Sequence, residues 1–364
     1  MFNRIVIVGV GLIGGSLGLA VRRKNKDIHI VGVSSAAAVK SAVEMGAINE
    51  GYGYDELGTA VADADIVFLC TPINRIKELM ADLSGLVKPG AIVTDVGSTK
   101  HEIAGHADDV LPDGVCFIGG HPMTGSEKSG VNASDPFLFQ NAIYVLCPAE
   151  NVPQELVDEF SGFLHETGAR VVSMESGLHD NIAAAISHVP QMIAVTLVNM
   201  VQDKTTDSAP YLQLAAGGFR DMTRIASSPF KMWDDICRTN ADAIRNTLDT
   251  FIEHLTGLKG RIGSEALGDD FENANHTRAN IPKDTKGFAK TLYEVLAVVE
   301  DKPGIIHRIA AELSGHNINI KDIEVMKVRE GEGGTLRLAF ELEDEAAHAV
   351  ELLNNIGFKS RLRG

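Results

Sequence analysis

The stretch "RIVIVGVGLIGGSLGLAVRR", residues 4–23, decides how the first half of this chain folds. An apolar, β-branched run is followed at once by Gly9, Gly11 and Gly14, and then by a segment of helical pattern. Gly9 permits a tight turn, Gly11 lets the backbone approach a pyrophosphate, and Gly14 lets the helix pack closely on the strand. The helix N-terminus would face the phosphate charge. The context therefore predicts a dinucleotide site that includes Gly9, Gly11, Leu12, Ile13 and Gly14.

Further apolar runs follow up to residue 172, separated by segments of helical pattern. They are "IHIVGV", "DIVFLC", "AIVTDV", "VCFIGG" and "AIYVLC". Strands that are apolar throughout and alternate with helices indicate a parallel sheet covered on both faces. We expect residues 1–172 to form an α/β domain with a doubly wound, Rossmann-type parallel sheet.

Residues 173–280 change to long helical patterns, "NIAAAISHVPQMIAVTLVNMVQ" and "WDDICRTNADAIRNTLDTFIEHLTGL". In the second, apolar residues recur at alternating spacings of four and three, which places a seam along one helix face. The seam consists of Ile244, Leu248, Phe251, Leu255 and Leu258. It needs a partner helix, in this chain or in another. We expect an all-helical domain here.

Residues 260–288 are polar and glycine-rich, which indicates an irregular connection or a short helix followed by a linker. Residues 290–364 then return to alternating strand and helix patterns in the order βαββαβ. This order predicts a separate, compact α+β domain of ferredoxin-like type.

Length and composition limit the class of protein. A chain of 364 residues exceeds one ordinary domain, and its 45% hydrophobic and 23% charged residues are typical of a soluble globular protein. The net charge of −16 would repel nucleic acid and anionic lipid, so we expect neither as a partner. The N-terminal apolar run is broken by glycines and predicts neither a signal peptide nor a membrane span. The cysteines, Cys70, Cys116, Cys147 and Cys237, form no CxxC pair, which favours a reducing cytoplasm and no metal site.

The end of the second expected strand bears on the choice of cofactor. NAD sites usually carry an acid about 20 residues beyond the glycine loop, where it binds the ribose hydroxyls. Here the strand "IHIVGVSS" ends in Ser34 and Ser35, and no arginine stands nearby to bind a 2′-phosphate. We assign Ser34 to the cofactor site, and both NAD and NADP stay open at this point.

Several expected strands deliver polar residues to one crevice, because ligands of open α/β sheets bind outside the carboxyl ends of the strands. "DIVFLC" delivers Thr71, "AIVTDV" delivers Ser98, and "VCFIGG" delivers His121. Pro122 keeps His121 out of the helical region, so the histidine should be extended with its ring in the crevice. Histidine is well suited to proton transfer near neutral pH, which makes His121 a candidate base. Ser98 is a candidate site residue or a simple helix N-cap.

The helical segment adds two candidates. "SHVPQM" places His188 inside an apolar helix, as a ligand contact or as a hydrogen-bonded core histidine. "GGFRDMTRIASSPFKMW" contains Arg224, either a clamp for a carboxylate or a member of a surface ion pair. The residues alone do not decide between these interpretations.

A family resemblance adds to these patterns. The segments "GVGLIGGSLG", "DVGSTK", "GGHPMTGSEKSG", "ISHVPQ" and "LAAGGFRDMTRIASSPFKMW" resemble, in this order, those of the prephenate and arogenate dehydrogenases of tyrosine biosynthesis. The resemblance covers about residues 1–260. It implies an NAD(P)-dependent oxidative decarboxylation of prephenate to 4-hydroxyphenylpyruvate, and an intertwined homodimer of the helical domain.

The resemblance also implies roles for single residues. His121 would take the proton of the substrate's ring hydroxyl as hydride leaves the same carbon. Ser98 would orient His121 and the nicotinamide or the hydroxyl, His188 would line the substrate pocket, and Arg224 would bind a substrate carboxylate. Ser126 and Glu127 of the same segment as His121 would line or gate this pocket.

The C-terminal segment "VVEDKPGIIHRIAAELSGHNINI" is similar to an ACT domain, a regulatory module that binds amino acids. This similarity implies feedback inhibition by tyrosine. The effector would bind at Asp301, Pro303, Gly304 and Ile305 and near Asn319.

Three other functions are compatible with parts of this pattern. Arogenate, the amino analogue of prephenate, could be the substrate. A β-hydroxyacid dehydrogenase would share the domain order but would use a catalytic lysine in the helical domain, where this chain offers His188 and Arg224. A nucleotide-sensing protein without enzymatic activity is the remaining alternative.

Overall fold

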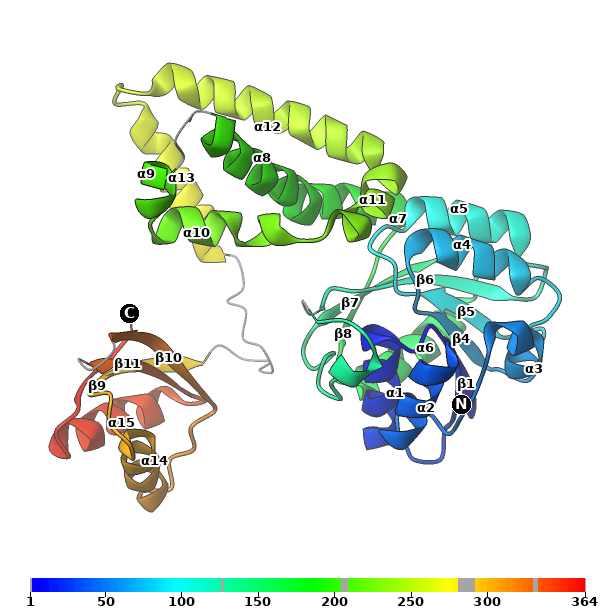
Figure 1. Cartoon of the computed structure of the whole chain (residues 1–364), viewed down its shortest axis with the longest axis horizontal. Helices are drawn as coiled ribbons and strands as arrows, with labels where there is room; N and C mark the ends of the chain where they lie inside the picture. The colour runs from blue at the N-terminus through cyan, green and yellow to red at the C-terminus, as the bar shows by residue number, and fades with distance from the viewer. Residues whose placement is uncertain (1, 126–127, 204–208, 281–291, 330–332, 364) are drawn as a thin grey trace. The chain divides into compact units, whose positions relative to one another are not determined.

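The computed structural model describes residues 2–125, 128–203, 209–280, 292–329 and 333–363 (Figure 1). Contacts between residues divide the chain into two compact units, Met1–Arg278 and Ala279–Gly364. The first unit contains a large sheet and a helical part, and the second contains a small sheet with two helices. The predicted classes of fold, Rossmann-type, all-helical and βαββαβ, are all present.

The large sheet has eight strands. In spatial order they are β3 (Glu50–Tyr52), β2 (His29–Val33), β1 (Arg4–Val8), β4 (Ile66–Leu69), β5 (Ile92–Asp95), β6 (Cys116–Pro122), β7 (Ile143–Pro148) and β8 (Arg170–Ser173). The strands from β3 to β6 are parallel to their neighbours, as predicted. β7 differs from the prediction, because it is antiparallel to β6. A parallel return needs a crossover, usually a helix, and the connection between β6 and β7 contains only the short 3₁₀ turn Val131–Ala133 among its described residues.

Helices cover both faces of this sheet. They are α1 (Leu12–Lys24), α2 (Ala36–Glu44), α3 (Leu57–Val61), α4 (Ile73–Asp82), α5 (His101–Val110) and α6 (Gln154–Glu166). Alternate residues of β1 enter different cores: Ile5 and Ile7 pack with α1 and α6, while Val6 and Val8 pack with α3, α4 and α5. Burial on both sides explains why the strands are apolar throughout.

The helical part of the first unit runs from α7 to α13. Its elements are α7 (Ser176–Ala183), the π-helical turn Ala184–His188, α8 (Val189–Asp203), α9 (Ala209–Gln213), α10 (Gly217–Thr223), the 3₁₀ turn Arg224–Ser227, α11 (Phe230–Thr239), α12 (Ala241–Arg261) and α13 (Leu267–Asn280). The first predicted helix is interrupted by the π turn directly before Pro190, which has no N–H to donate and would clash with a regular preceding turn. The second predicted helix is divided at Asn240, which leaves the helical region.

The predicted apolar seam on α12 has two different halves. Ile244 is buried and Leu248 packs beside it, against the π turn and the start of α8. Leu255 and Leu258 are 52% and 36% exposed. The first half therefore finds its partner within the chain, and the second half is open in the single chain.

The second unit has the predicted βαββαβ order (Figure 1). Its elements are β9 (Tyr293–Val299), α14 (Ile305–Gly315), β10 (Asp322–Arg329), β11 (Gly333–Phe340), α15 (Glu343–Asn355) and β12 (Lys359–Leu362). The strands form an antiparallel sheet in the order β10-β11-β9-β12. Val295, Leu338 and Phe340 pack with Ile309 of α14 and Leu353 of α15, so one face of the sheet holds the core.

The packing of α1 allows a test of the first unit. A Cβ atom at Gly18 would lie 2.1 Å from the carbonyl oxygen of Ala47, whereas one at Gly105, on the exposed face of α5, would meet nothing within 4 Å. We expect Gly18→Ala to destabilise the protein by about 1–3 kcal/mol and to lower the melting temperature. Gly105→Ala should raise stability by up to about 1 kcal/mol, because alanine favours the helix. Thermal unfolding followed by circular dichroism checks both, and equal melting temperatures for the two variants would contradict the close approach at Gly18.

Candidate active site

The predicted crevice residues lie at the carboxyl edge of neighbouring parallel strands. Gly9 follows β1, Thr71 follows β4, Ser98 follows β5, and His121 lies at the end of β6. The order β1-β4-β5-β6 is continuous in the sheet, so these positions share one edge. The structure therefore brings the glycine loop and the candidate base to the same side of the sheet.

The glycine loop has the geometry that a bound pyrophosphate requires. Gly9 has a φ of +96°, and a Cβ there would lie 2.5 Å from the carbonyl oxygen of Cys70. A Cβ at Gly14 would lie 2.5 Å from the carbonyl oxygen of Gly9, whereas one at Gly11 would enter open space. α1 begins at Leu12, and Gly11 supplies no side-chain cap for the first-turn N–H groups, including those of Leu12 and Ile13. The loop leaves room and N–H donors for an anion at the helix N-terminus.

Ser34 and Thr71 flank this loop. Ser34 directly follows β2 and donates its backbone N–H to the carbonyl oxygen of Tyr52 at 3.1 Å. The methyl carbon of Thr71 lies 2.7 Å from the place a Cβ of Gly9 would take. The Thr71 hydroxyl is buried without a hydrogen-bond partner among the described residues. A buried polar atom beside the loop fits a bound polar ligand.

His121 is extended within β6, as predicted, and pairs with Val145 of β7. Its Nδ1 lies 2.8 Å from Nε2 of His179, which starts a hydrogen-bonded chain described below. Burial, and then the neighbouring charges of Lys100, His179 and His188, lower the pKa of His121 well below its usual value. His121 is therefore neutral at physiological pH and has a lone pair available for a proton.

Asp180 organises the surroundings of His121, and the sequence patterns did not single it out. Its Oδ1 accepts the backbone N–H of Lys100 at 2.7 Å and lies 2.8 Å from Nδ1 of His179, while Oδ2 accepts the N–H of His101 at 2.9 Å. The carboxylate thus caps α5 from another part of the chain. The alternative in which Ser98 is a simple N-cap of α5 is wrong, because α5 begins at His101 and Asp180 binds its first N–H groups.

Lys100 follows β5 in a polar loop, yet only 1% of it is exposed. Its Nζ donates to the carboxylate of Asp95 and, at 2.7 Å, to the carbonyl oxygen of Gly120. Asp95 also accepts the N–H groups of Gly97 and Gly120. Both members of the buried pair are hydrogen-bonded beyond their contact with each other, which is the condition for a charge to be tolerated in the interior. It holds the backbone directly before His121.

The two glycines before His121 also have a packing reason. A Cβ at Gly120 would lie 2.5 Å from the carbonyl oxygen of Asp95. Only glycine lets β6 approach β5 closely enough for the contacts of Asp95 and Lys100 with Gly120.

His188 is buried in the π turn, with 2% of its surface exposed. Its Nδ1 accepts a hydrogen bond from Nδ2 of Asn240 at 3.2 Å, and its ring lies edge-on to Trp233. The pKa of His188 is lowered to about 4. Burial is the main cause, the Asp180 carboxylate opposes it, and His179 adds to it. These are features of a hydrogen-bonded core histidine that adjoins the network around His121. Its contact with substrate stays a prediction.

Arg224 is exposed on the 3₁₀ turn that follows α10. Gln191 of α8 fixes this turn by donating to the carbonyl oxygen of Ile225 at 3.0 Å. The turn is therefore anchored on the helix that carries the π turn and His188. Binding of a carboxylate by Arg224 stays a prediction.

The remaining predicted positions lie elsewhere. Ser126 and Glu127 lie outside the described residues. Asp301, Pro303 and Gly304 are exposed in the loop before α14, and Asn319 is exposed before β10. These effector positions belong to the second unit.

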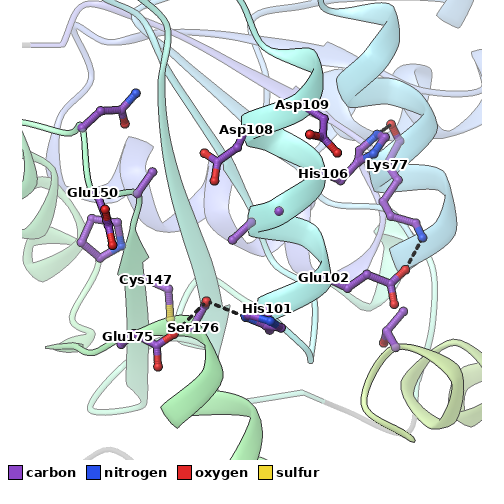
Figure 2. A pocket seen from close by; sticks show the side chains of 16 residues that line it. Lys77, His101, Glu102, His106, Asp108, Asp109, Cys147, Glu150, Glu175 and Ser176 are labelled. Atoms are coloured by element: carbon purple, nitrogen blue, oxygen red, sulfur yellow. Dashed lines mark hydrogen bonds and ion pairs between the residues drawn. The ribbon is translucent and has the colours of Figure 1, made fainter. Parts of the chain in front are cut away.

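A groove of about 920 Å³ occurs beside α5, away from the candidate residues (Figure 2). Residues of α5, the end of β7 and the start of α7 line it, and His121, Ser98 and the glycine loop are not among them. Its carboxylates, from Glu102, Asp108, Asp109, Glu150 and Glu175, outnumber its basic side chains. Such a lining repels an anionic substrate, so the groove is not the candidate active site.

A glycine loop for a pyrophosphate and a neutral histidine at the same sheet edge are what a dinucleotide-dependent dehydrogenase requires. The fold and site define the protein as a member of this class of oxidoreductases. Comparison with known proteins then identifies the family. The chain belongs to the prephenate dehydrogenase family: it matches "Prephenate dehydrogenase, nucleotide-binding domain" over residues 17–173, "Prephenate dehydrogenase, dimerization domain" over 175–273 and "ACT domain" over 293–357. The first match begins after Gly14, so the glycine loop rests on the structure itself.

Individual relatives agree with this family. The chain is 34% identical to a prephenate dehydrogenase of Bacillus subtilis (strain 168) over 359 residues, 97% of this chain and 96% of the relative. The solved prephenate dehydrogenase of A. aeolicus, in complex with hydroxyphenyl propionate and NAD+, superposes with a TM-score of 0.72 at 29% identity, over 78% of this chain and 99% of that one. Synechocystis arogenate dehydrogenase superposes with a TM-score of 0.70 at 31% identity, over 77% of this chain and all of that one.

The pKa of His188 predicts how stability depends on pH. The unfolded chain binds a proton at a histidine pKa of about 6.5, and folded His188 does so only near 4. Stability is therefore complete above about 6.5 and falls as the pH drops from there to 4, by roughly 3 kcal/mol in total. His188→Asn keeps an acceptor for Asn240 and removes the titration. When the pH is lowered from 7.5 to 5, the melting temperature of the wild type should fall by more than that of this variant. An equal fall in both proteins would contradict a buried, neutral His188.

Proposed function

We propose that the chain oxidises and decarboxylates prephenate with NAD, giving 4-hydroxyphenylpyruvate and carbon dioxide for tyrosine biosynthesis. The observation that carries this proposal is the position of His121, partly buried and hydrogen-bonded to His179, at the same edge of a nucleotide-binding sheet as the glycine loop in a chain of the prephenate dehydrogenase family. The glycine loop, the open space at Gly11 and the unpartnered Thr71 hydroxyl fit the cofactor.

His121 acts as the general base. Its Nε2 takes the proton of the ring hydroxyl as the hydride leaves the carbon that bears this hydroxyl. Bound NAD supplies the acceptor for that hydride. Loss of the ring carboxylate as carbon dioxide makes the ring aromatic. The low pKa of His121 keeps the base neutral before each turnover.

Other residues position the substrate. Ser98, partly buried at the end of β5, orients His121 and the hydroxyl. Arg224 binds a carboxylate through its guanidinium, on a turn held by Gln191. His188 lines the pocket next to this network.

NAD is preferred over NADP for this chain. The structure of the A. aeolicus relative contains NAD+. The end of β2 offers Ser34 and the Ser35 N-cap of α2, and neither carries the positive charge that a 2′-phosphate needs. Ser34 would contact the ribose hydroxyls.

Arogenate is the second candidate substrate, favoured by the similarity to Synechocystis arogenate dehydrogenase. The two substrates differ in the side chain, where a keto group replaces an amino group, and the proposed chemistry at the ring is the same. Activity with each substrate, measured with NAD and with NADP, separates the four combinations.

We also propose that the chain forms a homodimer through its helical part. Ile252 and Leu255 of α12, Ile262 directly after α12 and Phe271 of α13 are large apolar residues that are 52–70% exposed. Exposed apolar surface of this kind is typical of an interaction site. This region lies inside the matched dimerization domain.

By length and composition the helix Ser176–Asp203 could cross a membrane. However, it carries the buried polar residues His179, Asp180 and His188 and lies in the same domain. Its apolar surface fits a subunit interface.

The ACT domain would bind tyrosine and inhibit the enzyme. Gly304 has a φ of +89° and directly precedes α14, so the loop Asp301–Ile305 makes a tight turn at the helix start. Ile305 and Ile320 pack on the same core, so the loop and the residue next to Asn319 belong to one packed domain.

The free cysteines support a cytoplasmic location.

The role of His121 gives the first test of this function. His121→Asn should lower kcat by about 100-fold or more, because the base is lost, while the affinity for NAD stays within a factor of about two. His165→Asn, on the exposed face of α6, is the matched control. Steady-state kinetics and calorimetric titration with NAD measure both. Wild-type kcat in His121→Asn would remove the histidine from the mechanism.

The second test concerns Arg224. Arg224→Ala should raise KM for prephenate by about 10-fold or more, because a charged hydrogen bond to a carboxylate contributes about 1.5–3 kcal/mol. Arg220→Ala, on exposed α10, serves as the matched control. If Arg224→Ala lowers only the melting temperature and leaves KM unchanged, the residue belongs to a surface ion pair.

The third test concerns the effector. Tyrosine should inhibit the wild-type enzyme and raise its melting temperature, since a ligand that binds only the folded state stabilises it. Asn319→Ala should weaken both effects, and Asn355→Ala, at the exposed end of α15, should preserve them. Equal responses of the two variants would place the effector elsewhere.

A further inference from the structure

The ring of His121 is hydrogen-bonded to a second histidine that the family resemblance did not single out. His121 Nδ1 lies 2.8 Å from Nε2 of His179, and His179 Nδ1 lies 2.8 Å from Oδ1 of Asp180. His179 and Asp180 are only 3% and 4% exposed. The three side chains form a chain of hydrogen bonds that ends on a buried carboxylate.

The donors in this chain can be assigned from Asp180 outward. Both oxygens of Asp180 accept backbone N–H groups, from Lys100 and His101, which is the pattern of an ionised carboxylate. The nitrogen facing it, Nδ1 of His179, must then carry hydrogen. In neutral His179 the other nitrogen, Nε2, accepts, so the donor to it is Nδ1–H of His121.

This assignment leaves the lone pair of His121 on Nε2. The opposite arrangement needs a charged His179 that donates from Nε2, and it would place hydrogen on Nε2 of His121 and block it as a base. The neutral arrangement is the one that agrees with the proposed role of His121 as a base.

We propose that His179 is a positioning residue, oriented by Asp180, that holds His121 in the tautomer with hydrogen on Nδ1 and the lone pair on Nε2. The proposal rests on the proposed function of His121 as the base. When Nε2 takes the substrate proton, Nδ1 keeps its own hydrogen and continues to donate to His179. The imidazolium that forms then lies two hydrogen bonds from the carboxylate of Asp180, which stabilises its charge. After product release, Nε2 returns its proton to water.

Two variants separate positioning from simple packing. His179→Phe keeps an aromatic ring of similar volume and removes the acceptor. His179→Gln places an amide oxygen near the former Nε2, where it can accept from His121. We expect His179→Phe to lower kcat by about 10- to 100-fold with KM for prephenate and the affinity for NAD little changed, and His179→Gln to recover most of kcat.

The tautomer itself can be measured without activity. In protein labelled with 15N in its histidine rings, the His121 signals are assigned by their loss in His121→Asn. Wild type at pH 8 should show hydrogen on Nδ1 of His121, and His179→Phe should show a mixture of both tautomers. Melting temperature and affinity for NAD report whether each variant is folded.

The outcomes distinguish this proposal from the proposed function. Hydrogen on Nε2 of His121 in the wild type, or a higher kcat in folded His179→Phe than in His179→Gln, would overturn the positioning role. Retained activity in His121→Asn would instead overturn the role of His121 as base, whichever tautomer the spectra show.

Discussion

The carboxylate of Asp180 connects the two parts of the first unit at the point where the chemistry is proposed. One oxygen accepts the N–H of Lys100, the other accepts the N–H of His101, and the first also faces His179. The start of α5, which follows the crevice strand β5, is thereby tied to α7 of the helical part. Because a helix N-terminus carries partial positive charge, an acid from a distant segment is a stabilising cap. The orientation of His121 depends on the same acid, so the cap and the site share one residue.

The ion pair of Asp95 and Lys100 supports the backbone directly before His121, whereas Asp180 orients the His121 side chain through His179. β5 pairs with β6 only as far as Ile118, yet β6 continues to Pro122 and carries His121 beyond this point. Asp95 accepts the N–H of Gly120 and Lys100 donates to its carbonyl oxygen, so an ion pair replaces the missing strand neighbour. Buried ion pairs seldom increase stability over an apolar pair, because desolvation opposes the attraction. Here the pair satisfies backbone groups that would otherwise be buried without partners.

Local patterns could predict the parts of this protein that depend on local constraints. The glycine spacing predicted the first strand, turn and helix, because the positive φ of Gly9 and the close approach of Gly14 to Gly9 and Ile7 are set within a few residues. Pro122 predicted an extended His121 for a similar reason. His179 and Asp180 could not be found in this way, because their roles arise from contacts between residues about 60 to 80 positions apart. The role of Lys100 depends on how β5 and β6 pack, since its ammonium group reaches Gly120, 20 residues further on. A polar pair at the start of an otherwise apolar helix, "HD" at 179–180, was the available signal.

The antiparallel direction of β7 could also not be predicted from local patterns, and it affects how His121 is held. Past Ile118, the edge of β6 that faces β5 has no strand partner among the described residues and is hydrogen-bonded at Gly120. The other edge pairs with β7 from Ile118↔Pro148 to Pro122↔Tyr144. The antiparallel register thus supports the extension of β6 on the side away from β5 and keeps His121 in a regular strand. A base on a paired strand has less backbone freedom than one on a loop, so its nitrogen is presented to the crevice at a defined position. The side of β6 without a strand neighbour is therefore where the crevice can form.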